Sequence, residues 1–209
     1  MRPIGHMVQP ASLGGARETW SPSGMSWQPR FFERGARFTS IAAAAARFAD
    51  LPDWPSVDEI DRRLAADAGV RFVAAPKAPG YTTRIVGAGE VPTRPASWHD
   101  YLNALVWATF PMAKRSLTER IHALAAARGR GNRGREEDYL ALWDEGGVVV
   151  RGAEEIVFGH AIFEHLIRGE SVRGLGMRMR PEGSIDERLA AVLTAPFAPE
   201  TFRVEIRHE

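Results

Sequence analysis

Two histidines in this sequence are each followed, four residues later, by a polar side chain that can act with them. His99 precedes Asn103, and His160 precedes Glu164. Residues four apart lie on the same face of a helix, so two helices that pack through these faces bring together two imidazoles, a carboxylate and an amide. Two histidines and one carboxylate are a common ligand set for zinc or non-haem iron. The spacing predicts a divalent metal site with His99, His160 and Glu164 as ligands.

Further polar residues near these histidines are candidates for chemistry around such a metal. Asp100 fits the role of a general base or of an orienter of an imidazole, as does Asp144. Asn103 is expected to contact the substrate or a ligand, and Arg94 to bind an anionic group, because arginine pairs specifically with carboxylates and phosphates. These residues predict a metal-dependent hydrolase that acts on a small or anionic molecule.

The same residues also have structural interpretations. Ser97 followed by Asp100 fits a helix N-cap pattern, and Glu164 can pair with Arg168 four residues on. The spacing matches neither HExxH nor HxxEH. The histidines and their neighbours then form a buried polar network that fixes the pairing of two helices. In that case the chain is a non-enzymatic binding or regulatory domain, with the basic surface of residues 113–135 for nucleic acid or an acidic protein.

Charge is unevenly distributed, although the net charge is only +1. Residues 113–135 hold seven basic residues and one acid, and residues 136–155 hold seven acids and one arginine. The arginine-rich segment 128–135 is a candidate contact for nucleic-acid phosphates, but it lacks interleaved aromatic residues. Neutralisation by the following acids is therefore the favoured interpretation. Asp144 and Glu145, at the end of an expected helix, need a compensating charge, either from this arginine segment or from a bound cation.

The composition excludes several classes of site. The chain has no cysteine, which excludes disulfides, thiolate nucleophiles and cysteine-ligated metals. Its 209 residues, 44% hydrophobic and 25% charged, are typical of a globular domain with a sizeable core. No apolar run approaches the roughly 18 residues of a membrane span, and the first residues lack the apolar segment of a secretory signal. We therefore expect a cytoplasmic protein without membrane association.

The hydrophobic periodicity predicts a mainly helical α+β domain with a few short strands. Helices are expected at 38–49, 56–68, 98–110, 112–127, 136–143, 154–168 and 184–193. Strands are expected at 70–75, 81–86, 148–151 and 172–179. Residues 1–37 are expected to form an extended arm, held on the core by the rings of Trp20, Trp27, Phe31 and Phe32, before a single domain over 38–209. No glycine-rich motif joins a strand to a helix, which disfavours a classical nucleotide-binding fold.

Several strings of this sequence resemble one bacterial family, domain of unknown function 3025. They are Gly89-Glu90-Val91-Pro92-Thr93-Arg94, Trp98-His99-Asp100-Tyr101-Leu102-Asn103-Ala104-Leu105-Val106-Trp107, Phe110-Pro111 with Lys114, Asp144-Glu145-Gly146-Gly147-Val148, and Phe158-Gly159-His160-Ala161 with Glu164. The resemblance extends over about 81–168. It implies membership of a family without an established activity or cofactor, and it marks His99, Asp100, Asn103, His160 and Glu164 as motif positions. The segment 128–135 departs from the family pattern, in which a shorter and less basic link is expected.

Overall fold

The computed structural model describes residues 25–75, 78, 80–129, 133–180, 182–195 and 201–207. Within these residues the α-helices are α1 (Thr39–Ala46), α2 (Val57–Ala68), α3 (Tyr81–Ala88), α4 (Trp98–Thr109), α5 (Pro111–Arg128), α6 (Arg135–Gly146), α7 (His160–Ile167) and α8 (Ile185–Thr194). The strands are β1 (Arg71–Ala74), β2 (Glu90–Thr93), β3 (Gly147–Arg151), β4 (Glu154–Val157), β5 (Val172–Arg178) and β6 (Thr201–Ile206). The expected mainly helical α+β class is confirmed.

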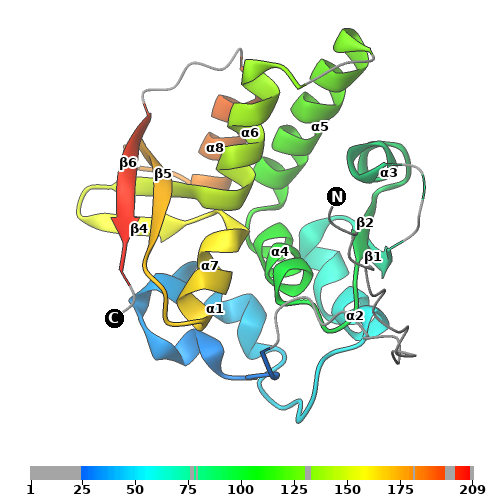
Figure 1. Ribbon diagram of the computed structural model, residues 1–209, viewed down its shortest axis with the longest axis vertical. Coiled ribbons are helices and arrows are strands. Elements are labelled where there is room, and N and C mark those ends of the chain that lie inside the picture. Colours follow the sequence, from blue (N-terminus) through cyan, green and yellow to red (C-terminus); the bar gives the residue numbers. More distant parts are fainter. Residues whose placement is uncertain are drawn as a thin grey trace, which may run out of the picture.

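The strands form two separate sheets, seen on the left and on the right of Figure 1. The larger sheet has the order β4-β3-β5-β6, with β3 parallel to β5 and antiparallel pairs at both edges. The smaller sheet is the parallel pair β1-β2. Helix α4 lies in the centre of the view, where it packs against α2 on one side and α7 on the other (Figure 1).

Helix α4 is buried around most of its circumference. Its buried residues include Trp98, Leu102, Leu105 and Trp107, which are fully enclosed. A helix that is apolar on nearly all sides is a core helix. The polar residues that α4 carries therefore face either another element or an internal pocket, which makes their positions informative.

Two expected elements are wrong. Residues 81–86, expected as a strand, belong to helix α3, and the strand that pairs with β1 is β2. Parallel neighbours need a crossover connection, and α3 is that crossover, so tertiary topology overrides the local preference of the β-branched residues. The helix expected over 154–168 begins only at His160. Its first residues form β4, which pairs with β3 after a turn at Gly152 with φ of 64°. Strand β6 was not expected.

The ends of several helices are set by capping residues, as expected. The hydroxyls of Ser56, Ser97 and Ser184 accept hydrogen bonds from backbone N–H groups in the first turns of α2, α4 and α8. Gly69 ends α2 in the left-handed conformation, with φ of 64°. Pro111 occupies the first turn of α5, where no donor is needed.

Aromatic rings connect the described part of the N-terminal segment to the core. The indole of Trp27 lies 5.4 Å from that of Trp98, centroid to centroid, and its Nε1 donates to the carbonyl of Leu51. Phe31 is fully buried. Trp20, like His6 and His208, lies outside the described residues, so the expected arm over 1–37 stays a prediction. In the described part of the chain, no helix is long and apolar enough to cross a membrane.

Candidate functional site

Helices α3, α4, α5, α6 and α7 contribute to the wall of a pocket of about 670 Å³. Of the residues that the sequence assigned to the metal site or to chemistry around it, all except Glu164 line this pocket. His99 and Asn103 come from α4, one turn apart, as their spacing predicts. His160, the first residue of α7, faces them across the pocket wall. Asp144 and Glu145 come from the last turn of α6.

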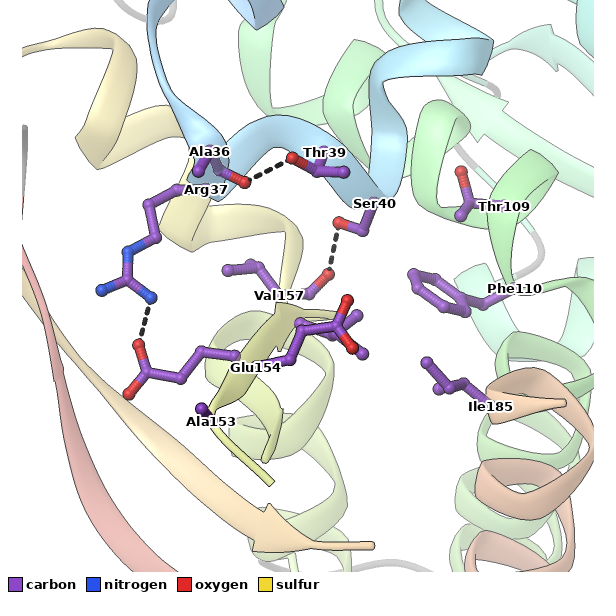
Figure 2. A pocket seen from close by; sticks show the side chains of 12 residues that line it. Ala36, Arg37, Thr39, Ser40, Thr109, Phe110, Ala153, Glu154, Val157 and Ile185 are labelled. Atoms are coloured by element: carbon purple, nitrogen blue, oxygen red, sulfur yellow. Dashed lines mark hydrogen bonds and ion pairs between the residues drawn. The ribbon is translucent and has the colours of Figure 1, made fainter. Parts of the chain in front are cut away.

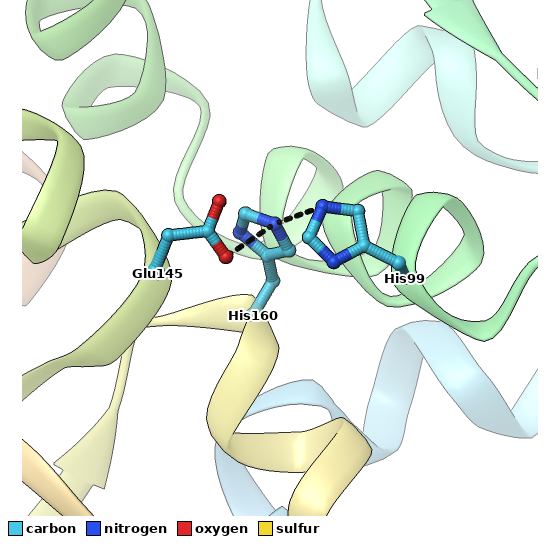
Figure 3. Close-up of side chains that lie close together, drawn as sticks. All are labelled: His99, Glu145 and His160. Atoms are coloured by element: carbon cyan, nitrogen blue, oxygen red, sulfur yellow. Dashed lines mark hydrogen bonds and ion pairs between the residues drawn. The ribbon is translucent and has the colours of Figure 1, made fainter. Parts of the chain in front are cut away.

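Three side chains bring metal-binding atoms together at one point of this pocket. Figure 3 shows the His160 ring between the Glu145 carboxylate and the His99 ring. The Nε2 atoms of the two histidines are 3.1 Å apart, and Glu145 Oε2 lies 3.4 Å from His160 Nε2. One ligand atom from each of the three residues lies within 4.8 Å of the others. Two of these three residues were predicted as ligands from the sequence.

The orientation of His160 is fixed by a backbone carbonyl. Its Nδ1 lies 2.9 Å from the carbonyl oxygen of Asp144. A carbonyl only accepts, so Nδ1 carries the hydrogen, and the Nε2 lone pair of the neutral ring faces the cluster. Burial, with Lys114 and His99 nearby, lowers the pKa of His160 to about 3. The ring is therefore a neutral nitrogen donor at neutral pH.

The orientation of His99 is set by a carboxylate. Glu164 Oε2 lies 3.6 Å from His99 Nδ1, on the side of the ring away from His160. This interaction raises the pKa of His99 above its usual value, against the opposing effect of burial. Because the Nε2 of His160 bears a lone pair, the hydrogen in the contact between the two rings belongs to His99 Nε2.

The structure thus gives Glu164 a different position from the expected one. It lies beside the outer nitrogen of His99 and pairs with Arg168, as the structural interpretation expected, while Glu145 supplies the carboxylate of the cluster. The physical reason is that His160 stands at the very start of α7 and its ring points towards the end of α6. Glu164, one turn further along α7, lies instead against Nδ1 of His99, the ring nitrogen that does not face His160.

A buried ion pair lies under the cluster. The Lys114 side chain is 1% exposed, and its ammonium binds the Asp144 carboxylate. Burial alone would raise the pKa of Asp144, but Lys114 and the two histidines hold it below the usual value. Asp144 therefore contributes twice: its side chain compensates Lys114, and its carbonyl orients His160. The charge that the sequence required at this helix end comes from Lys114, not from the arginine segment.

Glycine is required where the two chain segments of the cluster meet. A Cβ on Gly159 would lie 2.5 Å from the carbonyl oxygen of Glu145 and from the backbone of Gly146. The start of α7 can approach the end of α6 this closely only without a side chain at this position. Gly159, in one of the family strings, thus has a physical role, which is to let the start of α7 approach the end of α6 so that His160 and Glu145 lie close together.

The remaining predicted residues lie on the pocket wall. Asp100 accepts hydrogen bonds from the Arg94 guanidinium at 2.8 and 2.9 Å and from the Arg94 backbone N–H at 2.7 Å. The arginine expected to bind a substrate anion is thus engaged with Asp100. Asn103 Nδ2 lies 2.9 Å from the hydroxyl of Tyr81 on α3. The sequence missed Tyr81 because its segment was assigned to a strand.

Glu145 and Lys114 were the other residues missed as site members. Both lie in strings that resemble the family. Acids at the C-terminal end of a helix are unfavourable, so Asp144 and Glu145 indicated that a cation such as Lys114 lies nearby. The basic and acidic segments meet as expected, since Arg120 binds Glu136 and Arg128 binds Glu137. A nucleic-acid contact by segment 128–135 stays a prediction.

A second pocket, of about 570 Å³, lies between α1, β4 and the start of α8 (Figure 2). Its charged residues pair with one another or with close neighbours: Arg37 binds Glu155, and Glu154 binds Arg151. Ser40 donates to the carbonyl of Val157 at 2.9 Å. No histidine is among its lining residues, and no cluster of metal-binding atoms occurs there within the described residues.

Residues 70–158 match a family model described as "Protein of unknown function (DUF3025)". The match confirms the resemblance found in the sequence, and it includes His99 and Glu145 while ending two residues before His160. No curated protein matches the chain.

Two solved structures of phenylalanine hydroxylase from Chromobacterium violaceum are similar in fold to this chain. A variant with a tyrosine replaced by alanine has a TM-score of 0.54 and 14% identity, over 81% of this chain and 78% of that chain. A structure bound to cobalt has a TM-score of 0.50 and 15% identity, over 80% of this chain and 76% of that chain. At these identities the likeness establishes a common fold.

Proposed function

We propose that this protein is a metal-dependent enzyme whose divalent transition-metal ion is held by His99, His160 and Glu145. The observation that carries the proposal is the convergence of their donor atoms, all within 4.8 Å of one another. Two histidines and a carboxylate bind zinc and non-haem iron in many proteins.

Two of the three spacings between the donor atoms fit one shared ion. Two ligand atoms held about 2.1 Å from the same metal lie roughly 3.0–3.4 Å apart at bond angles of about 90–109°. The distances of 3.1 Å between the two histidine nitrogens and 3.4 Å between His160 and Glu145 agree with this range.

The residues around the donors support the same conclusion. Histidine ligands usually have their second ring nitrogen bound to a carboxylate or a carbonyl, which fixes the ring and its tautomer. Asp144 has this role for His160, and Glu164 has it for His99. Metal binding would release the hydrogen that His99 Nε2 directs at His160. Asp100, bound to Arg94, is on the pocket wall, where it can contact a substrate.

Three protein ligands leave positions for water or substrate, and the pocket of about 670 Å³ adjoins the cluster. When bound, such an ion supplies Lewis-acid or redox chemistry. The chain itself holds the donors in place, keeps the His160 ring neutral and encloses the substrate between α3, α4 and α5.

Two reaction classes use this ligand set. Hydrolysis with zinc is the class predicted from the sequence. Oxygen chemistry with iron(II) is the second candidate, and the fold shared with phenylalanine hydroxylase, one structure of which is bound to cobalt, favours it.

The test is a calorimetric titration of the chelator-treated chain with Fe²⁺ (without oxygen), Zn²⁺ and Co²⁺. We expect about one ion per chain, and loss of binding in His160→Ala. The matched control is His165→Ala, on the same helix, because His165 is partly exposed and pairs with Glu170. Absence of binding, or equal binding by wild type and His160→Ala, would contradict the proposal.

The reaction class is tested on the loaded chain. The zinc form is assayed with p-nitrophenyl esters, and the iron form is assayed for oxygen uptake with pools of small aromatic and aliphatic compounds. Activity in only one form, absent from His160→Ala and retained by His165→Ala, selects between hydrolysis and oxygenation.

A further inference from the structure

Asn103 is a buried polar residue with an unused hydrogen-bonding atom in the wall of the pocket. It is 7% exposed and lies one helical turn beyond His99. Its Nδ2 contacts the Tyr81 hydroxyl at 2.9 Å, and its Oδ1 is buried with no partner among the described residues. Nearly all buried polar side-chain atoms are hydrogen-bonded, so an unpaired one in a pocket wall needs an explanation.

Tyr81 has a matching unused group. Tyr81 as a whole residue is 40% exposed. Burial of the hydroxyl, with Asp144 nearby, raises its pKa above the usual value, so the hydroxyl keeps its hydrogen. The hydroxyl accepts from Asn103 and so retains its own O–H for another acceptor. Together the two side chains present one donor and one acceptor.

The conclusion does not depend on which way the amide is turned. With the amide reversed, Tyr81 donates to the amide oxygen and the amide nitrogen has free N–H groups. In either orientation, one amide atom satisfies Tyr81 and the other has no hydrogen-bond partner among the described residues.

The charges of the same wall favour a neutral ligand group. Three of its four carboxylates are paired with cations of the protein, in the pairs Arg94–Asp100, Lys114–Asp144 and Arg128–Glu137. The fourth, Glu145, lies beside the neutral His160, and its negative charge disfavours an anionic ligand. Arg133 also lines the pocket, but it is exposed to solvent, which weakens its attraction for an anion. The remaining wall is largely apolar, with Leu117, Ile121, Ala125 and Ala141.

We propose that Asn103 and Tyr81 form a subsite that binds a neutral carboxamide or hydroxyl group of a small, largely apolar substrate beside His99. The proposal names the substrate class of the metal site and depends on the proposed function for its catalytic meaning. Binding at the subsite itself depends only on the two side chains and the apolar wall.

The experiment compares benzamide with benzoate, which has the same size but carries a charge. The full chain is treated with chelator so that no metal contributes, and the dissociation constants are measured by ligand-observed NMR. We expect benzamide to bind more tightly than benzoate. Tyr81→Phe and Asn103→Leu should each weaken benzamide by about fivefold to tenfold, the effect of losing one hydrogen bond.

Tyr139→Phe is the matched control, because Tyr139 is also partly buried but does not line this pocket. It should leave benzamide binding unchanged. Circular dichroism shows whether Tyr81→Phe and Asn103→Leu are folded. If one of them folds poorly, the other still tests the subsite.

Benzoate binding as tightly as benzamide would overturn the proposal and indicate an anion site at Arg133. Unchanged benzamide binding in both variants would also overturn it. Failure of the metal titration described above would overturn the proposed function alone, because the benzamide measurement contains no metal.

Discussion

The two pockets differ little in volume, about 670 Å³ against about 570 Å³, but they differ in what their polar groups do. In the pocket between α1 and β4, Arg37 and Glu155 neutralise each other, and Ser40 is used by a backbone carbonyl (Figure 2). In the pocket beside α4, two imidazoles and a carboxylate point at one another (Figure 3). Volume therefore does not distinguish a functional site here, whereas convergence of metal-binding atoms does.

The two pockets also differ in how their ion pairs are enclosed. Lys114 is 1% exposed, whereas the side chains of Arg37 and Glu155 are 24% and 27% exposed. A charge removed from water needs its partner far more than a charge that water still reaches. The buried ion pair between Lys114 and Asp144 therefore lies next to the proposed metal site, where Asp144 also contacts His160.

The largest expected effect separates these two ion pairs. Lys114→Met leaves the Asp144 carboxylate buried and uncompensated, which should lower the free energy of unfolding by about 3–5 kcal/mol. Arg37→Met should cost about 1 kcal/mol or less. Urea denaturation monitored by tryptophan fluorescence measures both values.

The double variant Lys114→Met/Asp144→Leu tests the cause. If the loss comes from an uncompensated charge, removal of both charges should recover most of the stability. Equal losses for Lys114→Met and Arg37→Met would remove the distinction between the two pockets.

The next effect concerns the carboxylates. Glu145→Gln keeps the shape of the side chain but removes the charge from the cluster, so affinity for Zn²⁺ or Co²⁺ should fall by about 100-fold or more. Glu155→Gln, in the other pocket, should leave metal affinity unchanged. Competition with a chromophoric chelator measures both, and a similar fall in the two variants would contradict the assignment.

A smaller effect is expected for the residue that orients His99. Glu164→Gln should lower metal affinity by about tenfold, the lower end of the range for carboxylates that support a histidine ligand. Glu154→Gln, a carboxylate of the other pocket that pairs with Arg151, is the control. If Glu164→Gln removed binding as completely as Glu145→Gln, Glu164 would be a ligand, as the sequence spacing first suggested.

The smallest effect is a pH dependence of stability that involves Glu137, in the wall of the pocket beside α4. Hydrogen bonds from Arg128 and from the backbone of Gly134 lower the pKa of Glu137 to about 2, from about 4.5. Because the folded state favours the ionised form, this contribution to stability is complete above about pH 4.5 and is lost as the pH falls towards 2. Glu137→Gln should lower stability at pH 7 and show a shallower decline between pH 4.5 and 2 in urea denaturation.

An unchanged acid profile in Glu137→Gln would show that the ion pair with Arg128 contributes nothing to folding. The matched comparison is Glu136→Gln, whose carboxylate binds Arg120 on the same pair of helices.

Much of the site was accessible from the sequence because helical spacing is a local rule. The four-residue interval placed His99 and Asn103 on one face of α4, and both line the pocket. The prediction that His160 meets His99 was an inference about packing, and it holds at 3.1 Å. The same rule predicted Glu164 beside His160, where it failed to identify the carboxylate of the cluster.

Helix boundaries were also largely determined by sequence. Serine caps, Gly69 and Pro111 act through hydrogen bonds and dihedral angles within a few residues of themselves. The two wrong elements, 81–86 and 154–159, are those whose state depends on strand pairing: α3 is the crossover between the parallel strands β1 and β2, and β4 pairs with β3. A short segment of β-branched residues fits both a helix and a strand, and only the strand pairing decides between them.

The sequence by itself determined the class of the fold, the ends of most helices, the histidines of the candidate site and the absence of cysteine chemistry. Only the tertiary structure decided that Glu145 joins them, that Lys114 compensates Asp144 and that Tyr81 meets Asn103. The reason is the range of the forces involved. Caps and helical faces depend on neighbours within one turn, whereas a metal cluster depends on the crossing of helices that are far apart in the chain.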